Sequence, residues 1–203
     1  TCPRREDRES EDQDGGDADG EHEAGEAGGA LLSGRLTVNG APAMDWVAGV
    51  VAELAALPNV THLQNATVWG YREHNYLMVT ERAPDNPSLL ERSWRVRAGH
   101  VVTATGAIER GLVFGNNDRP GVMLASAVQT YVNRYGVAPG KRAVIFTTNN
   151  SAYEVAADLV AAGVKLVAIV DSRDRVPEEA RVLVPDIEIM AGKVVTEAQG
   201  GRQ

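Results

Sequence analysis

The chain has 203 residues, 43% of them hydrophobic, which is enough for one large globular domain. Its formal net charge of −8 lies wholly in residues 1–30, and the rest of the sequence is electrically balanced. Because no basic stripe is left, we expect no nucleic-acid partner, and no apolar run approaches the ~18 residues of a membrane helix. The single cysteine, Cys2, excludes an intramolecular disulfide. With a polar N-terminus, this predicts a cytoplasmic protein.

The first two segments differ sharply in composition. Residues 1–27 are acidic and rich in glycine, and such a segment buries too little apolar surface to offset its ordering entropy, so we predict a disordered tail. Residues 41–57 carry apolar side chains at helical spacing, with Pro42 suited to a first turn, and they predict an amphipathic helix.

The middle of the chain predicts strands joined by turns. A short strand is expected at 60–63, and strands at 66–71, 75–80 and 90–97 alternate or are β-branched, as in a small antiparallel meander. A further β-branched run at 100–105 predicts a buried parallel strand, whose following glycine, Gly106, lets a ligand approach the backbone closely. Plain turn chemistry at this glycine remains the alternative.

The C-terminal third predicts an α/β unit. A helix is expected at 122–135, ending at Gly136, and residues 142–171 spell a strand, a helix and a second strand. The glycine fingerprint of a phosphate loop is absent, because polar residues occupy 147–152. Asp171, at the end of the second strand, is either a ribose ligand or a turn acid. A short helix at 177–184 and strands at 186–190 and 193–196 complete the prediction.

Side chains suited to catalysis or metal binding are scarce. The four histidines have no ligand spacing to one another or to Cys2, so we predict no metal site. No nucleophile elbow is present, and for Glu109 we favour a structural role over an active-loop role. We therefore name no catalytic residue.

The segment after the predicted strand at 100–105 resembles a known family. Residues 104–110, 112–124 and 130–137 are similar to the alpha subunit of heterotetrameric sarcosine oxidase, and the resemblance extends over roughly residues 28–203. The long loop Asn116–Leu124 makes it specific. Related subunits of hydrogen cyanide synthase and of opine and proline dehydrogenases share parts of it.

The resemblance implies an α/β fold of the FAD/NAD(P)-binding, Rossmann-like class with a small antiparallel meander. It also implies an alpha subunit that binds NAD, with FMN near the alpha–beta interface and FAD in the beta subunit of a complex with beta, gamma and delta subunits. The reaction implied is oxidative demethylation of sarcosine to glycine, which yields hydrogen peroxide and passes a one-carbon unit to tetrahydrofolate.

Carried over by position, the resemblance implies three places of cofactor contact. They are the glycine pair and its neighbour (Gly28, Gly29, Ala30), a residue whose backbone meets the adenine (Val68) and a segment that passes under the dinucleotide (Thr105, Gly106, Ala107). The implied domains are 1–27 as the tail, 28–138 as a partial first dinucleotide-binding domain that includes the meander, and 139–203 as a partial second, nested one.

The sequence departs from the family pattern at both ends. The first strand and its phosphate loop, expected before Gly28, are missing, as is everything after Gln203, so the chain looks like a fragment that is inactive in isolation. Two alternatives stay open. One is a truncated remnant or interaction module that binds no cofactor, and the other is a subunit of a related opine or proline dehydrogenase or hydrogen cyanide synthase.

Overall fold

A computed structural model describes residues 26–82 and 88–200. The described chain divides into two compact units, one formed by residues 63–99 and the other by residues 27–62 together with 100–200. The tail predicted at 1–27 lies almost wholly outside the described residues.

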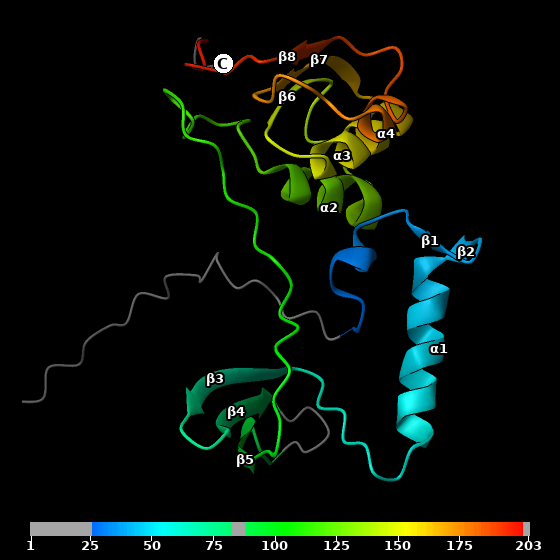
Figure 1. Ribbon diagram of the computed structural model, residues 1–203, viewed down its shortest axis with the longest axis vertical. Helices are drawn as coiled ribbons and strands as arrows, with labels where there is room; N and C mark the ends of the chain where they lie inside the picture. The colour runs from blue at the N-terminus through cyan, green and yellow to red at the C-terminus, as the bar shows by residue number, and fades with distance from the viewer. Residues whose placement is uncertain (1–25, 83–87, 201–203) are drawn as a thin grey trace, which may run out of the picture. The chain divides into compact units, whose positions relative to one another are not determined.

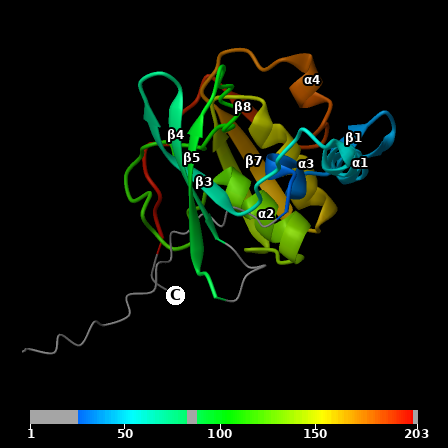
Figure 2. The same cartoon turned by 90° about the horizontal axis from the view of Figure 1, so that it is seen from below.

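The smaller unit is an antiparallel meander of three strands. Strands β3 (Ala66–Arg72), β4 (Tyr76–Arg82) and β5 (Glu91–Arg97) pair in the order β3-β4-β5 (Figure 2). Val68, Val79 and Trp94 stand in register across the sheet. Alternating apolar and polar side chains and β-branched residues favour the pairing of these segments. The predicted meander is confirmed.

The larger unit contains a parallel sheet of three strands. Strands β6 (Arg142–Thr147), β7 (Lys165–Asp171) and β8 (Ile189–Ala191) are ordered β6-β7-β8. Helix α3 (Ser151–Ala161) joins β6 to β7, and the short α4 (Glu178–Arg181) lies between β7 and β8. Parallel neighbouring strands require a crossover connection, and α3 provides it. The predicted strand–helix–strand unit is confirmed.

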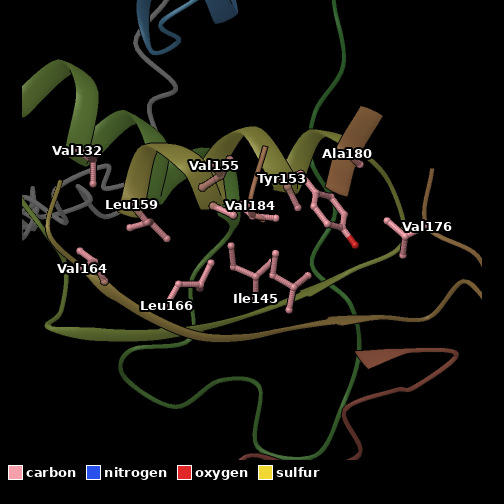
Figure 3. Close-up of a cluster of buried hydrophobic side chains, with 13 residues drawn as sticks. Val132, Ile145, Tyr153, Val155, Leu159, Val164, Leu166, Val176, Ala180 and Val184 are labelled. Carbon is pink, nitrogen blue, oxygen red and sulfur yellow. The ribbon is translucent and has the colours of Figure 1, made fainter. Parts of the chain in front are cut away.

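The core of this unit lies between the sheet and the inner face of α3. Figure 3 shows Leu159 above Leu166 and Ile145, with Tyr153 at the other end of the helix. The α3 residues that face the sheet are almost fully buried because they recur every three or four positions, which places them on one side of the helix.

Helix α2 (Ala125–Tyr135) forms an outer layer against α3, so that α3 lies between α2 and the sheet (Figure 1). Val132 of α2 joins the core. The helix ends at Gly136, whose φ of 65° is the left-handed conformation that a glycine adopts at low cost. The predicted helix and its stop signal are confirmed.

The N-terminal part of the larger unit begins with a 3₁₀ turn, η1 (Gly29–Leu32). A two-residue hairpin of β1 (Thr37–Val38) and β2 (Ala41–Pro42) follows and leads into α1 (Ala43–Ala56), which confirms the predicted helix. Of its residues only Ala43 and Val47 are buried.

Three predicted strands are wrong. Residues 60–63, 100–105 and 193–196 form no strand, and Val102 is 89% exposed. β-Branched residues favour an extended chain, but a strand also needs a paired neighbour, and no described strand runs beside these segments. The nearest approach to pairing is a single parallel bridge between Gly115 and Glu197.

Candidate functional site

The carboxyl ends of the parallel strands form the first candidate site. In the sheet register Thr147 ends β6 opposite Asp171, which ends β7 opposite Ala191 at the end of β8. In open α/β sheets this edge is where ligands bind. The carboxylate at this edge is that of Asp171, which is 0% exposed.

The carboxylate of Asp171 is fully occupied by protein donors. Arg173 donates to Oδ1 from its backbone amide at 2.9 Å and its Nε at 3.0 Å, and to Oδ2 from Nη2 at 2.7 Å. The Tyr153 hydroxyl also donates to Oδ2, at 2.8 Å. Arg173 Nη1 donates to Asn150 Oδ1 at 2.8 Å. Asp171 is therefore the centre of a closed cluster, which favours the turn-acid interpretation because a ribose hydroxyl finds no free oxygen there.

The titration of this cluster follows from its contacts. Burial disfavours the charged carboxylate, but the hydrogen bonds and positive charge of Arg173 outweigh burial and lower the pKa of Asp171. Burial, reinforced by the hydrogen bond to Asp171, raises the pKa of Tyr153 to about 12. The hydrogen bond to Asp171 raises the pKa of Arg173. At neutral pH the cluster is an ion pair with a neutral tyrosine, and it holds no group poised to exchange a proton.

The turn that follows β6 is filled by its own polar side chains. Asn149 Oδ1 accepts from the backbone amide of Ser151 at 3.1 Å and from its hydroxyl at 2.7 Å. The Thr147 hydroxyl lies 3.1 Å from the Asn149 carbonyl. An acceptor thus already occupies the amide at the start of α3, which is the position a phosphate takes in a glycine-rich loop.

The predicted glycine pair has the opposite character. Gly28 has φ 139° and Gly29 has φ 53°, both in the region that favours glycine. A Cβ on Gly28 would stand 3.1 Å from side-chain atoms of Leu32 and Met44, whereas one on Gly29 would meet nothing within 4 Å. Gly29 and Ala30 are exposed, so this turn offers open backbone to a ligand.

The remaining predicted contacts lie in open positions. Thr105, Gly106 and Ala107 are exposed in an irregular segment, and Gly106 has φ 72° with nothing within 4 Å of a built Cβ. Val68 lies in β3 of the smaller unit and is 55% exposed. The predicted contacts at Gly28–Ala30 and Thr105–Ala107 thus belong to the larger unit, and Val68 belongs to the smaller one.

Sequence reasoning missed two participants. Tyr153 and Arg173 were not singled out, although an arginine two residues after a strand-ending acid is a signal for a local ion pair. The structural role favoured for Glu109 is confirmed. Its carboxylate accepts from the backbone amides of Ala125 at 3.2 Å and Ser126 at 2.7 Å, so it caps the N-terminus of α2.

Within residues 26–82 and 88–200, no three His, Cys, Asp or Glu side chains are grouped so that they could hold a metal. In the same part of the chain, every helix is too short or too polar to cross a membrane.

A parallel sheet with a crossover helix, continued by one short helix and a third strand and accompanied by an antiparallel meander, defines an α/β fold of the FAD/NAD(P)-binding, Rossmann-like class. The crystal structure of L-proline dehydrogenase from P. horikoshii supports this class. It matches with a TM-score of 0.56 and 26% identity, over 76% of this chain and 30% of that chain.

The resemblance to sarcosine oxidase alpha subunits is confirmed. The chain is 49% identical over 152 residues to the one from Rhizobium meliloti (strain 1021) and 44% identical over 186 residues to the one from Corynebacterium sp. (strain P-1). These matches cover 72% and 87% of this chain but 15% and 19% of those subunits. An opine oxidase subunit from Agrobacterium tumefaciens (strain Ach5) is 30% identical over 63% of this chain and 25% of its own length. No protein-family model matches the sequence. The chain therefore belongs to the family of sarcosine oxidase alpha subunits and spans only part of their length.

Proposed function

We propose that the chain is part of the NAD-binding alpha subunit of a sarcosine-oxidase-type enzyme. The observation that carries this proposal is the identity of 41–49% to sarcosine oxidase alpha subunits over most of the chain. The chain spans 15–19% of the length of those subunits, and we assign the activity to the whole enzyme rather than to this part of it.

Exposed glycine-containing segments of the larger unit support the proposed nucleotide contact. Gly29, Ala30 and the segment Thr105–Ala107 are exposed, and a Cβ built at Gly29 or Gly106 would meet nothing within 4 Å. Backbone groups of this kind are suited to hold ribose, phosphate or an adenine edge. Val68 is the third contact that we propose. When bound, NAD supplies hydride-transfer chemistry.

The chemistry of amine oxidation is assigned to other subunits. In the proposed complex FMN lies near the alpha–beta interface, FAD oxidises the amine in the beta subunit, and gamma and delta subunits complete a cytoplasmic heterotetramer. The overall reaction is oxidative demethylation of sarcosine to glycine, with hydrogen peroxide as a product and a one-carbon unit passed to tetrahydrofolate. We assign no catalytic residue to this chain.

A second candidate is the alpha-type subunit of an opine or proline dehydrogenase. The likenesses to the opine oxidase subunit of Agrobacterium tumefaciens and to L-proline dehydrogenase favour it. Their identities of 30% and 26% are lower than those to the sarcosine oxidase subunits, and for this reason sarcosine, an N-methyl amino acid, is the preferred substrate.

Calorimetric titration tests the nucleotide proposal. NAD is titrated into the chain and into a longer protein that contains it, and we expect heat of binding from the longer protein. If the longer protein gives no heat at millimolar NAD, then the proposal is wrong for this site.

A matched pair of variants locates the binding. Gly29 and Gly40 both have positive φ and open surroundings, and aspartate tolerates this conformation better than most residues. Gly29→Asp places a negative charge beside the proposed nucleotide and is expected to weaken NAD binding at least about tenfold. Gly40→Asp, in the β1–β2 turn, and Asn150→Ala, beside the closed Asp171 cluster, are expected to leave the affinity unchanged.

A further inference from the structure

A polar cluster lies between helices α2 and α3 of the larger unit, away from the Asp171 edge. Its centre is Asp158 of α3, whose side chain is 12% exposed. Asp158 Oδ2 accepts from Gln129 Nε2 at 2.8 Å and from Asn133 Nδ2 at 2.6 Å, both from α2. A buried carboxylate is costly to desolvate, and the two amide donors from α2 offset that cost.

The same cluster reaches the segment that follows η1. Asn133 Nδ2 also donates to the Ser33 carbonyl at 2.8 Å, and the hydroxyls of Thr130 and Ser33 are 2.9 Å apart. Arg35 Nε lies 3.8 Å from Asp158 Oδ1. Arg35 is 54% exposed, so this ion pair is weak, and the amide contacts of Asn133 are the main link.

Ser33 is hydrogen-bonded to the glycine turn (Gly28–Ala30). Its backbone amide donates to the Ala30 carbonyl at 3.2 Å, and the amide of Leu31 donates to the Gly28 carbonyl at 3.0 Å. A turn of this size has few contacts of its own, because every residue of η1 is half-buried or exposed. Apart from the packing of Leu32 and Met44 beside Gly28, its position depends on what holds Ser33.

The geometry points to Asp158 as a positioning residue for nucleotide binding. Through Asn133 it holds Ser33, and through Ser33 it fixes the turn Gly28–Ala30, in which Gly29 and Ala30 are exposed. This inference rests on the proposed function for its consequence, which is the NAD affinity. The positioning itself stands on the contacts alone.

The test measures hydrogen exchange of backbone amides and NAD affinity in the same proteins. In Asp158→Ala we expect peptides covering 27–36 to exchange about tenfold faster, while β6 and β7 keep their protection. Asp158→Asn keeps an oxygen acceptor for the two amide donors, and we expect it to restore the slow exchange. Glu154→Ala removes an exposed carboxylate from the same helix and is expected to change nothing.

The outcomes separate the two proposals. Unchanged exchange at 27–36 in Asp158→Ala, or equal acceleration at 27–36 and in the sheet, overturns the positioning role. Should Asp158→Ala fail to fold, Asn133→Ala removes the side-chain amide that links Asp158 to Ser33 and leaves the carboxylate in place. Faster exchange at 27–36 is then the expected result, and an unchanged rate refutes the inference. If the longer wild-type protein binds no NAD, the nucleotide proposal fails, and the exchange data still decide the positioning.

Discussion

Removal of the Asp171 carboxylate is expected to destabilise the larger unit strongly. Asp171→Ala leaves the Tyr153 hydroxyl, in a side chain with 0% exposure, without an acceptor, and it leaves Arg173 without its partner. Breaking a buried ion pair by removing one partner costs about 3–5 kcal/mol. Because the Arg173 side chain is 28% exposed and can turn toward water, we expect the low end, about 3 kcal/mol.

A double-mutant cycle tests the mechanism behind this number. Tyr153→Phe alone removes one of the four hydrogen bonds to the carboxylate and is expected to cost about 1 kcal/mol. In the double variant the orphaned hydroxyl is gone, so its loss is smaller than the sum of the single losses by about 1–2 kcal/mol. Urea unfolding followed by circular dichroism gives the free energies. Additive losses would refute the reasoning, because they would mean that Tyr153 and Asp171 do not interact.

Three further predictions follow from the same contacts. The lowered pKa of Asp171 contributes stability that is present above its unfolded value and is lost as the pH falls, so acid unfolding below about pH 4 should be shallower in Asp171→Asn. The raised pKa of Tyr153 contributes stability that is present below pH 10 and is lost as the pH rises toward 12; Tyr153→Phe should remove this alkaline decline in the free energy of unfolding. Glu109→Ala removes the cap of α2 and should lower the free energy of unfolding by about 1 kcal/mol in a urea titration, whereas a change near zero would show that the cap is not formed in solution.

The sequence predicted a helix or strand correctly where the local pattern agreed with the neighbouring element that it packs against. The apolar spacing of α2 and its stop at Gly136, and the strand–helix–strand unit at 142–171, were predicted correctly for this reason. The β-branched run at 100–105 was not, because strand formation depends on a neighbour that the local pattern does not reveal.

The closed hydrogen-bonded cluster around Asp171 could not be predicted from residue spacing. Spacing correctly placed this acid at the carboxyl end of β7, but the Tyr153 hydroxyl arrives from a helix 18 residues earlier in the chain. That contact exists only when α3 is docked on the sheet, and docking is a tertiary result. Propensity and periodicity describe single elements and carry no information about which polar side chains meet across them.

The larger unit has two candidate positions for a nucleotide, the carboxyl edge of the parallel sheet and the turn at Gly29. Their surfaces differ, and the difference indicates separate roles. At the carboxyl edge of the sheet, polar side chains satisfy the carboxylate of Asp171 and the first amide of α3, so a ligand there would have to displace protein contacts. At Gly29 the backbone is exposed and unobstructed. A ligand that displaces no internal hydrogen bond binds at lower cost, because ordered donors and acceptors are expensive to leave unpaired. The glycine turn is therefore the better candidate for cofactor contact, and the Asp171 cluster serves to lock α3 onto the sheet.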